Sequence, residues 1–118
     1  MLQKEGLPMT YSVEKAAAEL MLEHEDLIEI LYFFFGEADK ILSQCEKAVE
    51  ESDFAVLRQL FHSLKGTTAN FRMDSLNQMA VTLEKAAQTD NLDLVKGMLP
   101  DFTRELNSVR EQVERYSG

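Results

Sequence analysis

Apolar residues recur at alternating intervals of four and three between residues 27 and 48 of the chain. Such spacing keeps side chains on one face of an α-helix. The phase continues across Gly36, so a single long helix over residues 27–51 is predicted, and further apolar residues beside the seam suggest packing on more than one side. The seam consists of Leu27, Leu31, Phe34, Ala38, Ile41, Cys45 and Ala48, and the residues that widen it are Ile30, Phe33, Phe35 and Leu42.

Shorter stretches with the same periodicity predict four more helices. They cover about residues 12–23, 54–71, 75–88 and 92–116. Pro100 lies inside the last of them, and because proline removes a backbone hydrogen bond and clashes with the preceding turn, a break or kink is predicted near residues 98–99. Asp26 and Glu29 resemble a capping box for the long helix. Asp74 is predicted to be the N-cap of the helix that follows it.

The chain shows no alternation of apolar and polar residues of the kind that marks a β-strand. It has 118 residues, with only five glycines and two prolines, which favours helix and a single domain. We therefore predict an all-α domain over residues 10–118, after a flexible lead-in over residues 1–9. The predicted architecture is an antiparallel four-helix bundle with a short additional N-terminal helix laid across one end.

The charge and the single cysteine limit the possible partners and compartment. The formal net charge is −9, which disfavours binding to nucleic acid or an anionic membrane because their phosphates would repel the chain. Cys45 falls on an apolar helical position and is interpreted as a small core residue in a reducing compartment. The first residues lack the apolar core of a signal peptide, and the apolar run over residues 27–35 is too short to span a bilayer. A soluble, cytoplasmic monomer is expected.

Metal and nucleotide sites are not expected. His24 stands among Glu23, Glu25 and Asp26, but consecutive residues of a helix point in different directions and would not share one metal ion. The chain has no glycine-rich phosphate loop and no cysteine and histidine spacing typical of zinc. No cofactor is therefore predicted for this chain.

His62 is the residue that carries a candidate chemistry. It lies roughly 120° from the centre of the apolar face of its predicted helix, so it should face outward. Lys65 and Gly66 follow one turn later, and Arg58 and Ala69 border the same surface. An exposed imidazole is nucleophilic near neutral pH; Lys65 could stabilise a phosphoryl group on it, and Gly66 would leave room for a close approach. From composition alone, an ordinary surface histidine is the alternative.

The segment that begins at His62 resembles the signature of histidine-containing phosphotransfer (HPt) domains, the carriers of bacterial and fungal phosphorelays. The family pattern is histidine, any residue, leucine, lysine and glycine, then small residues that often include Ala-Asn, an apolar residue and a glycine. Arg72 stands where that last glycine is expected. The helix plan extends the resemblance to about residues 10–117. The matching positions are His62, Leu64, Lys65, Gly66, Ala69, Asn70 and Phe71.

The resemblance implies a role for several residues. His62 would accept a phosphoryl group from a receiver-domain aspartyl phosphate and pass it to another receiver aspartate, with Lys65 stabilising the charge and Gly66 giving access. Mg²⁺ would be bound by the receiver. Some family members place a glutamine of the neighbouring helix against the active histidine, and an ungapped count puts Glu84 at that position. Glu84 would then fix the tautomer of the imidazole; a solvated glutamate is the alternative.

The expected partners are receiver domains of response regulators or hybrid sensor kinases. Their docking surface should surround His62 and include Arg58 and Ala69, together with Leu20 and Met21 of the first helix. Because no nucleotide-binding segment is present, the chain is interpreted as a phosphoryl carrier and not as a kinase.

Two other functions remain open at this point. One is a helical adaptor that binds a signalling partner without phosphotransfer. The other is the dimerising phosphoacceptor domain of a histidine kinase. Such domains resemble a helical hairpin with an acidic residue directly after the histidine, whereas Ser63 follows His62 here.

Overall fold

The computed structural model describes residues 11–117, and this part of the chain contains five α-helices and no strand. The predicted all-helical class is confirmed. The lead-in predicted for residues 1–9 lies outside the described residues. The helices are α2 (Val13–Leu20), α3 (His24–Glu50), α4 (Phe54–Asn70), α5 (Asp74–Gln88) and α6 (Leu92–Ser117).

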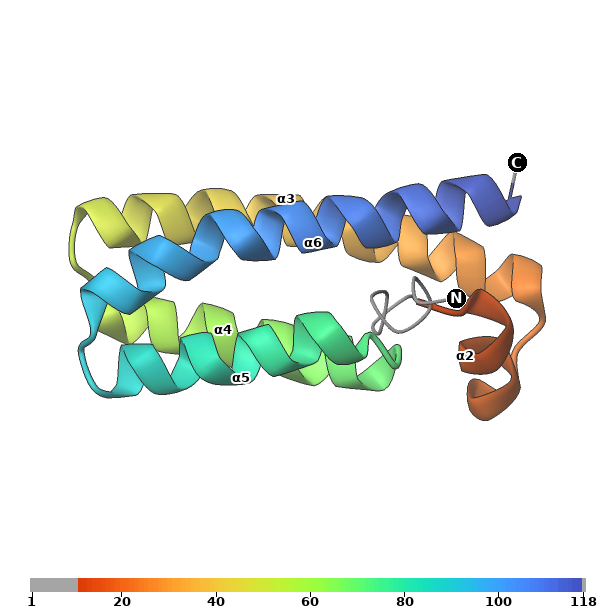
Figure 1. Ribbon diagram of the computed structural model, residues 1–118, viewed down its shortest axis with the longest axis horizontal. Coiled ribbons are helices and arrows are strands. Elements are labelled where there is room, and N and C mark those ends of the chain that lie inside the picture. The colour runs from red at the N-terminus through yellow and green to blue at the C-terminus, as the bar shows by residue number, and fades with distance from the viewer. Residues whose placement is uncertain (1–10, 118) are drawn as a thin grey trace, which may run out of the picture.

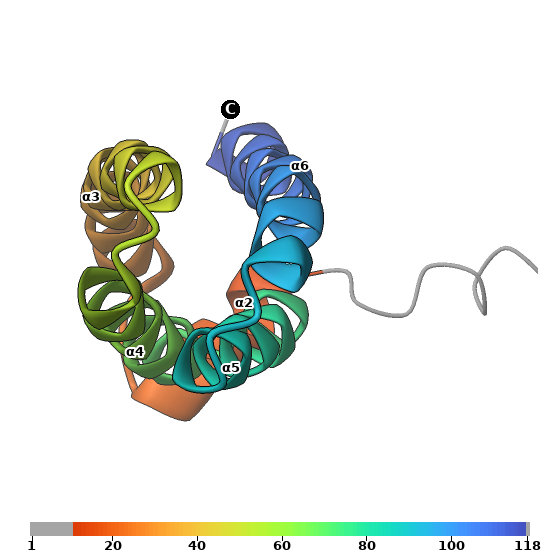
Figure 2. The same cartoon turned by 90° about the vertical axis from the view of Figure 1, so that its left-hand side faces the viewer.

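The four long helices lie side by side, and the chain reverses direction at each connection between them (Figure 1). Viewed along the bundle, α3, α4, α5 and α6 follow one another around a common interior (Figure 2). Each contacts the next, and α3 also contacts α6, so the ring of contacts is closed. The short α2 packs against α3 at one end of the bundle.

The predicted apolar seam of α3 faces the interior. All its members are buried except Ile41, which is only partly covered. The prediction that this helix is packed on more than one side is confirmed, because α3 contacts α4, α6 and α2. The residues that widen the seam differ in burial. Phe35 and Leu42 are buried, whereas Phe33 is 70% exposed and Ile30 is also exposed, because no described helix covers that flank of α3. Cys45 is a buried free cysteine, as predicted.

All four helix connections turn at a non-glycine residue in the left-handed conformation, with φ between 52° and 60°. After each, the next amide donates to the carbonyl five residues earlier, as in Met73 N to Thr68 O at 2.9 Å. The turning residue itself donates to the carbonyl three residues earlier, so each connection is a Schellman motif. The turning residues are Met21, Ser52, Arg72 and Asp90.

These turns explain why two predicted helix starts are wrong. The turn at Met21 ends α2 at Leu20, and α3 begins directly at His24, so Asp26 lies in its first turn and does not cap it. Similarly, α5 begins at Asp74 with Met73 at the N-cap position. In both cases the backbone of the preceding turn, and not a capping side chain, sets where the helix begins.

Pro100 does not break α6, which runs as one helix from Leu92 to Ser117. Of the predicted break or kink, the break is therefore wrong. A proline leaves the carbonyl four residues earlier without its helical donor, and that carbonyl belongs to Lys96, an exposed residue whose backbone water can reach. The loss of this hydrogen bond therefore costs less free energy than it would at a buried carbonyl.

Arg72 holds the end of α4 by its side chain as well as its backbone. Its φ is 60°, a conformation that costs roughly 1–2 kcal/mol for a residue with a Cβ. The guanidinium Nη1 donates to the carbonyls of Asn70 (3.0 Å) and Ala69 (3.3 Å). Its Nε pairs with Glu19 of α2 at 2.8 Å. These bonds offset the strain where the family pattern has glycine, and they attach α2 to the bundle.

We expect Arg72→Ala to lower the free energy of unfolding by about 1 kcal/mol, because it removes these bonds and keeps the strain. Arg72→Gly removes the same bonds but relieves the strain, so its stability should stay within about 0.5 kcal/mol of the original chain. Urea unfolding followed by circular dichroism measures both. Equal losses for the two substitutions would contradict this account of the turn.

Candidate functional site

Helix α4 presents His62 to solvent because the opposite face of the helix is buried in the core. The buried residues of α4 are Leu57, Phe61, Leu64 and Thr68. His62 lies away from them, and its side chain is 70% exposed. The outward orientation predicted from the helical period is therefore confirmed.

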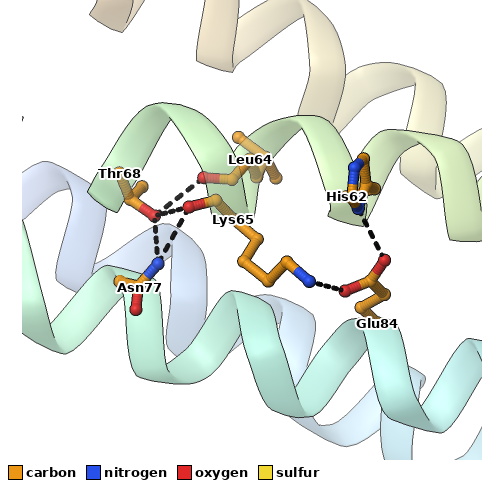
Figure 3. Close-up of polar contacts among 6 residues, drawn as sticks. All are labelled: His62, Leu64, Lys65, Thr68, Asn77 and Glu84. Atoms are coloured by element: carbon orange, nitrogen blue, oxygen red, sulfur yellow. Dashed lines mark hydrogen bonds and ion pairs between the residues drawn. The ribbon is translucent and has the colours of Figure 1, made fainter. Parts of the chain in front are cut away.

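Glu84 of α5 contacts both candidate residues of α4 (Figure 3). Its Oε2 lies 2.9 Å from Nδ1 of His62, and its Oε1 lies 2.6 Å from Nζ of Lys65. The Glu84 side chain is only 12% exposed, whereas that of Lys65 is 35% exposed. A solvated glutamate was the alternative, and the structure places Glu84 instead between two helices with both oxygens engaged.

The contacts of Glu84 keep its carboxyl group ionised. The hydrogen bond from Lys65 is the main cause that lowers its pKa from the ordinary 4.5; partial burial opposes this, and the bond from His62 adds to it. A carboxylate can only accept a hydrogen bond, so Nδ1 of His62 must carry the proton. The neutral ring then has its lone pair on Nε2, and no described residue hydrogen-bonds that atom. Nε2 is thus available as a nucleophile at the surface.

A polar cluster next to this site fixes α4 against α5. Nδ2 of Asn77 donates to the carbonyl of Lys65 at 2.8 Å and to the hydroxyl of Thr68 at 3.3 Å. The Thr68 hydroxyl donates to the carbonyl of Leu64 at 2.7 Å and is fully buried (Figure 3). The cluster sets the spacing of the two helices one turn from Lys65. Sequence reasoning missed it, although Asn77 precedes Glu84 by seven residues and so shares its face of α5.

The predicted partner-binding residues are distributed unevenly around His62. Arg58 is exposed one turn before His62 and pairs with Asp90 at 3.8 Å. Ala69 is exposed two turns after it. Leu20 is partly buried and Met21 is 90% exposed, but α2 adjoins the end of α4, near Arg72. That end is roughly 15 Å along the helix from His62, so α2 stands at the margin of the surface.

Space over Gly66 is open. A Cβ built there would have no neighbour within 4 Å, so no packing contact of the described chain requires glycine. Gly97 of α6 is equally open, which makes it a useful comparison. The role of Gly66 in access stays a prediction.

His24 contacts Tyr116 at the end of α6. Its Nδ1 lies 2.5 Å from the Tyr116 hydroxyl, and the two rings meet edge to face. Among residues 11–117 no group of three potential metal ligands comes together. Within the same range, no helix has the length and apolar content needed to cross a membrane.

The family model of the Hpt domain matches residues 29–115, which is most of the chain. This chain belongs to the Hpt domain family. Hpt domains serve phosphotransfer in two-component signalling and interact with receiver domains, and this general role applies here. Searches found no matching curated protein and no matching solved structure.

The depressed pKa of Glu84 has a consequence for stability. A group whose pKa is lowered by folding stabilises the fold above its ordinary pKa, and this contribution is lost as the pH falls through the folded value. We expect Glu84→Gln to lower the free energy of unfolding at about pH 7, and the difference from the original chain to shrink below the ordinary value of 4.5. Urea unfolding of both proteins across that range measures it. Glu111→Gln, at an exposed site on α6, should produce no such pH-dependent difference, and the same trend in both variants would refute the assignment.

Proposed function

We propose that His62 is the phosphoryl acceptor of this Hpt domain. It receives the group from a receiver-domain aspartyl phosphate and passes it to the aspartate of another receiver. The observation that supports this is the exposed His62 ring, with Nδ1 bound by Glu84 and Nε2 free. The antiparallel four-helix bundle serves as a rigid support that holds α4 and α5 in register.

The transfer needs little from this chain beyond the nucleophile. Phosphoryl transfer depends on in-line geometry and on neutralisation of charge. Nε2 of His62 provides the attacking lone pair, and the flexible ammonium of Lys65 is one turn away to reach a phosphoryl oxygen. The receiver contributes the aspartate and the Mg²⁺ that it binds.

The charge of α4 supports docking on this face. The chain as a whole has a net charge of −9, yet α4 contains no acidic residue and carries Arg58 and Lys65. A partner that presents carboxylates around its own phosphorylation site would meet its least repulsive surface here. Ala69 and the open space over Gly66 lie within this surface, with Leu20 and Met21 at its margin. One monomer of the domain would bind one receiver at a time.

His62→Gln is expected to abolish phosphorylation while leaving the fold intact, because the side chain is exposed. The assay incubates the protein with Mg²⁺ and a panel of phosphorylated receiver domains and follows acid-labile, base-stable label. His24→Gln is the matched control and should keep its label. Persistent labelling of His62→Gln would refute the assignment; no labelling of the original chain by any receiver would favour a helical adaptor without phosphotransfer.

Gly66→Ala should stabilise the fold and slow the transfer. Alanine in a helix is favoured over glycine by about 1 kcal/mol, and the added methyl would occupy the open space where we place the receiver. Gly97→Ala in α6 should give similar stabilisation without any change in transfer rate. Thermal unfolding and single-turnover transfer from one receiver provide the two measurements, and unchanged transfer in Gly66→Ala would remove the access role.

A further inference from the structure

Glu84 does more at this site than choose a tautomer. We propose that its carboxylate keeps the phosphorylated ring of His62 in the cationic form, which makes the phosphohistidine of this chain short-lived and ready to donate. The proposal rests on the proposed role of His62. Glu84 acts through the imidazole and is in this sense a positioning residue.

The Nδ1 proton of His62 stays on the ring throughout the transfer. In the resting site Nδ1 of His62 keeps its proton and donates a hydrogen bond to Oε2 of Glu84 at 2.9 Å. When the Nε2 lone pair forms the bond to phosphorus, the bond between phosphorus and the receiver aspartate breaks, and its electron pair stays on that carboxylate. Nδ1 has not lost its proton, so the ring becomes an N-phosphoryl imidazolium with one positive charge. In the onward step a second aspartate attacks, the pair of the P–N bond returns to Nε2, and the neutral ring is restored.

The charge of the ring decides how easily the P–N bond breaks. A protonated ring leaves as neutral imidazole, whereas a ring that has lost the Nδ1 proton must leave as an imidazolate, a far stronger base. A neutral amide at position 84 could accept the same hydrogen bond but would not neutralise the cation. A carboxylate does both, as the buried aspartate does for the imidazolium of serine proteases.

The charged groups around the ring are few. On α4, Lys65 and Arg58 are cationic, but Lys65 is bound to Oε1 of Glu84 at 2.6 Å and Arg58 is turned toward Asp90. On α5, Glu84 is the charged residue that touches the ring. Lys85 follows it on the exposed side of that helix.

The other neighbour of α4 is α3, and the structure shows no ion pair between a described charged residue of α3 and His62. Glu84 is thus the one anionic side chain among residues 11–117 that the structure shows in contact with the imidazole. An opposite charge in contact with the phosphorylated ring favours its cationic form, and for an exposed ring we expect an effect at the lower end of the usual range, about one pH unit.

The test uses chemically phosphorylated protein, so that no receiver is needed. The original chain and Glu84→Gln are loaded with potassium phosphoramidate, and ³¹P NMR follows the phosphohistidine signal and its decay as a function of pH. His62→Gln identifies the signal of His62 against that of His24. Asp90→Asn removes a negative charge nearby that does not touch His62, and serves as the matched control.

We expect the pH at which the ring loses its proton to be about one unit lower in Glu84→Gln. Above that pH, loss of phosphate should be slower in this variant, by up to about tenfold for one unit. Lys65→Met removes the cation that competes with the ring for Glu84. It should raise the pH at which the phosphorylated ring loses its proton. Asp90→Asn should follow the original chain.

The proposal would be overturned if the original chain and Glu84→Gln lost phosphate with the same dependence on pH. It would also be overturned if the ring of Glu84→Gln lost its proton at a higher pH than that of the original chain. Circular dichroism of each variant verifies that the fold is retained. The chemically loaded protein still reports on Glu84 if no receiver phosphorylates the chain, in which case only the proposed function fails. Transfer from receivers with coincident profiles would instead leave the function intact and remove this inference.

Discussion

The contact between α4 and α5 is the interaction on which the site depends. The nucleophile and the lysine come from α4, and the carboxylate that joins them comes from α5. A displacement of one helix by a fraction of a turn would separate the 2.6 Å and 2.9 Å contacts of Glu84. Asn77 and Thr68 oppose this with partly buried hydrogen bonds, and at the fully buried Thr68 an unsatisfied polar group would be costly. The polar cluster and the apolar core therefore act together to define the site.

Helical periodicity was sufficient to predict much of this structure. The seam of α3 and the outward position of His62 follow from 3.6 residues per turn, because burial of one face decides the orientation of the other. Glu84 was reached by counting along the family motif without gaps. Its second contact, to Lys65, was not predicted. This contact depends on the distance between α4 and α5, and the periodicity of a single helix carries no information about that distance.

Two helix starts were predicted wrongly because the backbone of the preceding turn, and not a side chain, sets the boundary. The starts of α3 and α5 were predicted from side chains that commonly cap helices, but the turn before each of them sets the boundary. No glycine marks these turns, so the sequence carried no signal for the left-handed residue. Phe33 was placed in a packed flank because it is apolar and near the seam, yet the bundle has no further described helix to cover it.

The four turns share one hydrogen-bonded design, and this has a consequence for how the chain can vary. Because main-chain atoms make the reversal at Met21, Ser52, Arg72 and Asp90, the side chains at these positions are not needed to direct the chain. They are left to take on separate tasks. Arg72 attaches α2 to the end of α4, and Asp90 pairs with Arg58 beside the candidate site. The corners of the bundle can thus diverge to suit different neighbours while the path of the backbone stays the same.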